Sequence, residues 1–168
     1  MQIEVDQSGK IGDTGVPTVL AFSDGESYAI LISATVKREC YAYLRKYYRA
    51  LRQPHMKVFA AALFLLLQDR LAELSLIMID TEYTGQEAII KGLLLEHIRT
   101  AVPDFNSDTI IFREIGKKSP AHRKAIAAYR RRIKPDYVVK SEEMIVLLRK
   151  QKRPGDSGYV RNQSQFGP

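Results

Sequence analysis

The sequence predicts an α/β domain built on a mixed sheet. Three observations support this class: short β-rich runs joined by turns at the start, an alternation of strands and helices after them, and a globular composition with 45% hydrophobic and 27% charged residues. With 168 residues the chain is long enough for one domain with a sizeable core. We assign residues 1–153 to this domain and residues 154–168, rich in Gly, Ser and Gln, to a flexible tail.

The first third of the chain predicts a three-strand antiparallel meander. The β-rich runs are Ile3–Asp6, Thr18–Phe22 and Ser27–Ile32. The pair Asp24-Gly25 between the last two runs is a strong hairpin signal, because it tolerates the positive φ that tight turns need.

Two helices are predicted after the meander. Apolar residues at three- and four-residue spacing indicate an amphipathic helix over Thr35–Leu51. Pro54 ends that pattern, and a largely apolar helix over His55–Leu74 is suited to packing flat against a sheet.

Strands and helices alternate in the rest of the chain. A helix from about Thr84 begins with the Thr-x-x-Glu spacing of a capping box, and the basic helix begins with the N-cap Ser119 followed by Pro120. The predicted elements are a strand Leu76–Asp80 that is apolar on both faces, a helix from Thr84 to Ala101, a strand Thr109–Ile115, a basic helix from Pro120 to Lys134, a candidate short strand Tyr137–Val139 and a helix from Ser141 to the Arg149 region.

Positive charge is concentrated in one stretch of the chain. Although the net charge is +7, residues 1–110 hold 11 Lys/Arg and 14 Asp/Glu, whereas residues 111–153 hold 14 and 4. Such a concentration predicts a surface for a polyanion, and the alternative is a solvated basic helix without a partner. The candidate phosphate-binding residues in this stretch are Lys117, Lys118, Arg123, Lys124, Arg130 and Arg131.

Membrane and secreted classes are disfavoured. The longest apolar run, Val58–Leu67, is about half of the roughly 20 residues needed to cross a bilayer, and no signal peptide opens the chain. The single cysteine, Cys40, excludes an internal disulfide and a CxxC metal site and suits a reducing compartment. We therefore expect a cytoplasmic protein with no membrane partner.

Two aspartates end predicted strands. If the strands of Asp6 and Asp80 are neighbours, about 4.8 Å apart, both carboxylates point into the crevice where open α/β sheets bind ligands. Carboxylates this close repel each other unless a cation lies between them, and Mg²⁺ or Mn²⁺ suits such ligands. Glu82 adds a third carboxylate within reach. The alternative for each aspartate is a turn or cap residue.

The chain resembles the ribonuclease H-like superfamily over roughly residues 1–134. Val5–Gly9 resembles that family's first strand with its catalytic Asp, Ile77–Glu82 its fourth strand with the second Asp, and Ile115–Arg123 the junction of the fifth strand with the last catalytic helix. The resemblance implies a mixed five-stranded sheet with strand order 3-2-1-4-5 flanked by helices. Its members include ribonucleases H, junction resolvases, integrases and several exonucleases.

The resemblance also implies roles for further residues. Glu39 matches the place of the catalytic Glu of ribonucleases H, and Glu82 is its rival as a metal ligand; a surface ion pair is the alternative for Glu39. His122 lies where some resolvase-like members carry a His, and a neutral imidazole can ligate a metal or take a proton from water. The alternative for His122 is a residue at the helix start that contacts phosphate. The basic helix departs from ribonucleases H because it has no acid.

These observations predict a divalent-metal-dependent nuclease that hydrolyses DNA or RNA. Asp6, Asp80 and Glu82 would hold the metal, with Glu39 and His122 as further candidate catalytic residues. One alternative is a non-catalytic nucleic-acid-binding protein of the same fold, and another is a scaffold that docks an acidic protein. A resolvase would act as a homodimer, because two strands must be cut symmetrically.

Overall fold

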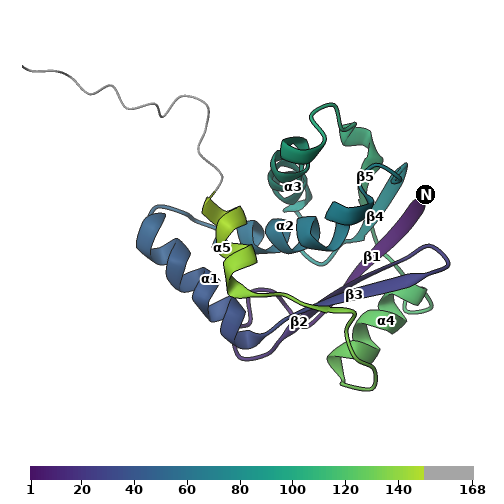
Figure 1. Ribbon diagram of the computed structural model, residues 1–168, viewed down its shortest axis with the longest axis horizontal. Coiled ribbons are helices and arrows are strands. Elements are labelled where there is room, and N and C mark those ends of the chain that lie inside the picture. Colours follow the sequence, from purple (N-terminus) through teal and green to yellow (C-terminus); the bar gives the residue numbers. More distant parts are fainter. Residues whose placement is uncertain (150–168) are drawn as a thin grey trace, which may run out of the picture.

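A mixed sheet of six strands lies at the centre of the protein in the computed structural model, which describes residues 1–149 (Figure 1). The strands are β1 (Gln2–Ser8), β2 (Thr18–Ser23), β3 (Ser27–Ile32), β4 (Leu76–Asp80), β5 (Ile110–Arg113) and β6 (Tyr137–Val138). They lie in the order β5-β4-β1-β2-β3-β6. The antiparallel pairs β1–β2 and β2–β3 and the parallel pairs β1–β4, β4–β5 and β3–β6 confirm the α/β class and the meander. The predicted tail, residues 154–168, lies outside the described residues.

The expected five-stranded sheet has a sixth strand. The first five strands have the expected neighbours, but β6 adds to the edge formed by β3. Asp136 explains this addition: its N–H donates to the carbonyl of Ala29 at 2.9 Å, and its side chain accepts from the N–H of Ala29 at 2.8 Å. The two bonds hold the chain beside β3 just before β6 begins.

The helices cover the two faces of the sheet unequally. They are α1 (Ala34–Tyr47), α2 (Pro54–Leu67), α3 (Glu87–Ala101), α4 (Pro120–Tyr129) and α5 (Ser141–Arg149). Only α4 among them packs on one face, against β1, β2 and β3, whereas the large core lies on the other face beneath the remaining helices (Figure 1). Within residues 1–149, no helix combines the length and apolar character needed to span a membrane.

Small side chains let α4 lie close to the sheet. The helix and the strands beneath it contribute a second, smaller core. Its buried members are Ala125 and Ala128 from α4 and Val19, Ala21 and Ala29 from β2 and β3. Ala121, one turn earlier on α4, is also buried. The alanines recur at helical spacing, so one face of α4 is flat and apolar while the opposite face carries its basic residues.

The helix boundaries differ from those predicted for α1, α2 and α3. α1 ends at Tyr47, before the expected Leu51, and α2 ends at Leu67, where a 3₁₀ turn from Gln68 to Arg70 replaces the expected continuation. α3 begins at Glu87 with Gln86 as its N-cap, so the predicted capping box at Thr84 does not form. The cause is Gly85, whose φ of 82° places a turn between Thr84 and the helix.

α4 is shorter than the predicted helix to Lys134. It ends at Tyr129 because Arg131 has a φ of 59°, and the chain turns there. The N–H groups of Arg131 and Arg132 return to the carbonyls of Ala128 and Ala127, the pattern of a Schellman motif. An arginine thus occupies the left-handed position that usually belongs to glycine.

Strand boundaries and burial also differ from the prediction. β5 ends at Arg113, two residues before the expected Ile115. β1 continues to Ser8, because the residues after Asp6 pair with β2, so Asp6 is not the last residue of its strand. β4 is buried on one face only: Ile77 and Ile79 point into the large core, whereas Met78 is partly exposed. The other face of β4 is on the side of the sheet where α4 packs against β1, β2 and β3.

Candidate metal centre

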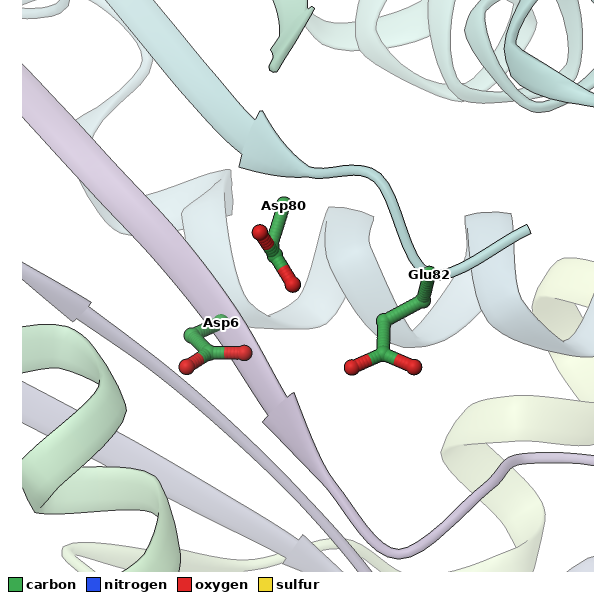
Figure 2. A group of neighbouring side chains, drawn as sticks. All are labelled: Asp6, Asp80 and Glu82. Carbon is green, nitrogen blue, oxygen red and sulfur yellow. The ribbon is translucent and has the colours of Figure 1, made fainter. Parts of the chain in front are cut away.

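Three carboxylates meet at one edge of the sheet. Oxygens of Asp6, Asp80 and Glu82 all lie within 4.8 Å of one another. Asp6 comes from β1, Asp80 ends β4, and Glu82 lies in the segment that follows β4. Their carboxylates converge in the space between β1 and this part of the chain (Figure 2). The predicted meeting of the two aspartates is confirmed, and Glu82 joins them.

Strand register explains this meeting. β1 and β4 are parallel, with Val5 opposite Ile79, so the next residues along, Asp6 and Asp80, are also side by side. Because Val5 and Ile79 point into the large core, side chains one residue later point to the opposite face, where α4 lies. The carboxylates therefore lie on the face of the sheet that the basic helix partly covers.

Asp6 is the most enclosed of the three carboxylates. Its side chain accepts from the N–H of Gln7 at 2.6 Å, and its second oxygen lies 2.6 Å from Nδ1 of His122. Burial raises the pKa of the Asp6 carboxyl above its ordinary 3.8, and nearby Asp80 adds to the rise, while the bonds from Gln7 and His122 oppose it. Ionised Asp6 is thus held in a site that favours a neighbouring cation.

Asp80 links the cluster to the segment before α4. Its side chain is half-buried, and one carboxylate oxygen accepts from the N–H of Ile115 at 2.6 Å. Since Ile115 follows β5 and precedes the basic residues Lys117 and Lys118, this bond holds the connection to α4 beside the cluster.

The Glu82 residue is exposed, but the charges of the neighbouring carboxylates act on its carboxyl. Loss of solvation raises the pKa of Glu82 above its ordinary 4.5, and Asp80 and Asp6 add to the rise, while Lys10 and His122 oppose it. The next residue fixes this segment: the hydroxyl of Tyr83 accepts from Gln7 Nε2 and from the N–H of Ile11, both at 3.1 Å.

Two contacts fix the first turn of α4 over β1. One is the bond from His122 to Asp6, and the other is made by the N-cap Ser119, whose hydroxyl donates to Glu4 at 2.6 Å and accepts from the N–H of Ala121. The predicted N-cap is confirmed. His122 therefore belongs to the cluster as a partner of Asp6.

Glu39 lies elsewhere. It is exposed on α1 and is not among the carboxylates that converge in residues 1–149. Of the two glutamates, only Glu82 therefore lies in the carboxylate cluster of the described residues.

The predicted phosphate-binding residues occupy both ends of α4. Lys117, Lys118 and Arg123 are exposed near its N-terminus, and Arg130 and Arg131 are exposed just after its end. Lys124 differs, because its Nζ lies 3.0 Å from Asp136. This ion pair ties α4 to the start of β6 and competes with any phosphate for Lys124.

Sequence reasoning missed the residues that support the cluster. Glu4, which binds Ser119 and lies 3.4 Å from Arg113, precedes Asp6 by two positions, so strand alternation could have placed it on the same face. Tyr83 gave no such signal, because its partners Gln7 and Ile11 are more than 70 residues away.

No protein-family model matches the chain, and no curated protein or solved structure matches it either. The geometry of the carboxylates and the charges around them are therefore what indicates a function.

Proposed function

We propose that this protein is a divalent-metal-dependent nuclease of ribonuclease H-like fold that hydrolyses phosphodiester bonds of DNA or RNA. The observation that carries the proposal is the convergence of Asp6, Asp80 and Glu82 within 4.8 Å. Carboxylates so close to one another raise the free energy of the metal-free protein, so a site built from them favours cation binding.

The donor set fits Mg²⁺ or Mn²⁺. Hard divalent cations prefer oxygen ligands, and Mg²⁺ is usually held by one or two carboxylates together with water and substrate phosphate. Asp80 and Glu82 are accessible enough to share a cation with a substrate, whereas Asp6 is buried and lies on the side of the site away from solvent. The bound cation would supply an activated water and positive charge at the reacting phosphate.

His122 is placed to handle a proton. An ionised Asp6 accepts from Nδ1 of a neutral His122, which leaves the other ring nitrogen, Nε2, as an acceptor that can take a proton from an attacking water. Asp6 then has two functions: it contributes an oxygen to the cluster and it orients the imidazole. This arrangement gives α4 a proton acceptor although the helix carries no carboxylate.

The basic residues beside the cluster suit a phosphodiester backbone. Lys117 and Lys118 precede the N-terminus of α4, where free N–H groups and the helix dipole already favour an anion. Because the bond from Ile115 to Asp80 holds this segment at the cluster, phosphate bound there lies next to the carboxylates.

One observation favours a second candidate, a non-catalytic nucleic-acid-binding protein. From Pro120 to Tyr129 the helix beside the cluster has no acidic residue, unlike that of ribonucleases H. Such a protein would bind nucleic acid with a strong salt dependence and would be indifferent to a chelator.

Cleavage of labelled oligonucleotides tests the proposal. The wild-type protein should degrade DNA or RNA with Mg²⁺ or Mn²⁺ and stop when a chelator is added. Asp80→Asn should lose activity and keep its fold, because an amide oxygen can still accept from the N–H of Ile115. Glu82→Gln should lose more activity than the matched variant Glu39→Gln. Binding without cleavage under every metal condition would favour the second candidate, and binding of neither DNA nor RNA would exclude both.

A further inference from the structure

A glycine-rich loop between β1 and β2 borders the carboxylate cluster. Residues 9–15 read Gly-Lys-Ile-Gly-Asp-Thr-Gly and follow β1, the strand that carries Asp6. Gly9 has a φ of 79°, and a Cβ there would lie 2.2 Å from the carbonyl of Pro17 and 2.6 Å from the ring of Tyr129. The loop therefore begins in close contact with the last turn of α4.

Side chains from other elements hold this loop at several points. Tyr41 donates to the carbonyl of Ile11 at 2.9 Å, Tyr83 accepts from the N–H of Ile11, and Arg38 donates to the carbonyl of Thr14 at 2.9 Å. A connection between two strands that needs only to turn would not require so many partners, so its position is closely determined.

Lys37 is the most unusual of these partners. It is fully buried on α1, and its Nζ donates to the carbonyls of Lys10 and Asp13 and to the hydroxyl of Thr18. Desolvation lowers the pKa of Lys37 to about 8, because burial disfavours the charged ammonium. A buried ammonium with neutral acceptors is a costly way to stabilise a fold, and an apolar side chain of similar size often serves as well.

The loop places Lys10 near the cluster, because the N–H of the next residue, Ile11, donates to the hydroxyl of Tyr83, which directly follows Glu82. Lys10 is exposed, and its positive charge acts on the carboxyl of Glu82. It makes no ion pair with an acidic side chain in the part of the chain from 1 to 149. Its main-chain carbonyl, by contrast, is fixed by Lys37.

We propose that Lys10 contacts a phosphate of the nucleic-acid substrate next to the carboxylate cluster, and that Lys37 is a positioning residue that holds the loop 9–15 for this contact. The inference rests on the proposed function, because it needs a nucleic-acid substrate. It extends that function to the side of the cluster opposite β5, where Gly9 connects the loop to the end of α4.

Salt-dependent binding tests the role of Lys10. Affinity for a short fluorescein-labelled DNA duplex and for the matching RNA–DNA hybrid is measured with Ca²⁺ in place of Mg²⁺, to suppress cleavage, over a range of salt. Lys10→Ala should weaken binding and reduce the slope of log K against log salt by about 0.9, the value for one phosphate contact on B-DNA. Lys10→Arg should keep the slope. Arg70→Ala is the matched control, because Arg70 pairs with Glu26 and Glu73 at the opposite end of the strands.

A double-mutant cycle tests the role of Lys37. Lys37→Met should fold, weaken binding and reduce the salt slope, and Lys10→Ala combined with Lys37→Met should bind no more weakly than Lys10→Ala alone. Thr18→Val, which removes one acceptor of Lys37, is the milder variant if Lys37→Met does not fold. A merely structural role would instead make the two losses add.

The outcomes separate this inference from the proposed function. If the wild type binds and cleaves but Lys10→Ala behaves like Arg70→Ala, the phosphate contact is wrong and the nuclease stands. If the losses from Lys10→Ala and Lys37→Met add, the positioning role is wrong. If the wild type binds neither probe, the inference and the proposed function are both overturned.

Discussion

Asp80→Asn is expected to make the metal-free protein more stable, although it alters a half-buried native side chain. Oxygens of Asp6, Asp80 and Glu82 lie within 4.8 Å of one another. Two unit charges at that separation repel by about 0.9 kcal/mol in bulk water and by about 3.5 kcal/mol at an effective dielectric constant of about 20. The substitution removes two of the three repulsions in the cluster.

Part of this gain is lost at Ile115. The N–H of Ile115 donates to the Asp80 carboxylate at 2.6 Å, and a bond to a neutral amide oxygen is weaker by about 1 kcal/mol. Because Asp80 itself is only half-buried, solvent screens both of its repulsions, and each lies near the value for water, about 0.9 kcal/mol. We expect a net gain of about 1 kcal/mol, which raises the Tm of a protein of this size by about 2 to 4 °C.

The same substitution should remove the response to metal. A divalent cation at a hundred times its Kd stabilises the wild type by about 2.7 kcal/mol, equivalent to about 5 to 10 °C in Tm. Thermal unfolding of both proteins, followed by circular dichroism with chelator and with Mn²⁺, measures both effects. Asp104→Asn, at an exposed aspartate outside the cluster, is the control and should respond to Mn²⁺ like the wild type.

Either of two results would refute this reasoning. A lower Tm of Asp80→Asn in chelator would show that repulsion within the cluster is not the dominant energy at this position. An undiminished Mn²⁺ shift in Asp80→Asn would show that the ion binds elsewhere.

Three further predictions concern pH and the backbone. The pKa values of Asp6 and Glu82 are raised in the folded state, so their protonated forms stabilise the fold below the ordinary pKa values of 3.8 and 4.5, and this stabilisation is lost as pH rises through the raised values. In chelator, the Tm should therefore fall over this pH range, and Glu82→Gln should make the fall smaller. Arg131→Gly relieves the left-handed φ of 59° and should increase the free energy of unfolding by up to about 1 kcal/mol in urea titrations, while reducing the salt dependence of nucleic-acid binding. Gly9→Ala should lower the free energy of unfolding by more than about 2 kcal/mol, because the methyl group meets a backbone carbonyl and the ring of Tyr129; an unchanged urea midpoint would contradict the described loop.

The sequence predicted the elements of the sheet because their signals are local. The Asp24-Gly25 turn, the strand that ends at Asp80 and the N-cap Ser119 each depend on neighbouring residues, and each forms where it was expected, although the strand is buried on one face only. The pairing of β1 with β4 was expected only from the resemblance to the ribonuclease H-like superfamily, and it was enough to bring Asp6 and Asp80 together.

Other features depend on contacts that no local pattern records. Glu82 lies in the carboxylate cluster and Glu39 does not, because of the path of the segment after β4, which Tyr83 bonds to Gln7 and Ile11. Lys37 stands next to Arg38 and Glu39 along the chain, and these charged neighbours hid the fact that it lies on the same side of α1 as the buried residues Cys40, Tyr41 and Leu44. The sixth strand requires the bonds between Asp136 and Ala29, which are 107 residues apart.

Anomalous diffraction from crystals soaked in Mn²⁺ tests the central claim most directly. We predict a manganese peak within bonding distance of carboxylate oxygens of Asp6 and Asp80, with Glu82 completing the set. A manganese ion bound by neither aspartate, or no ion at concentrations that saturate binding in solution, would contradict the metal centre and the nuclease proposed from it.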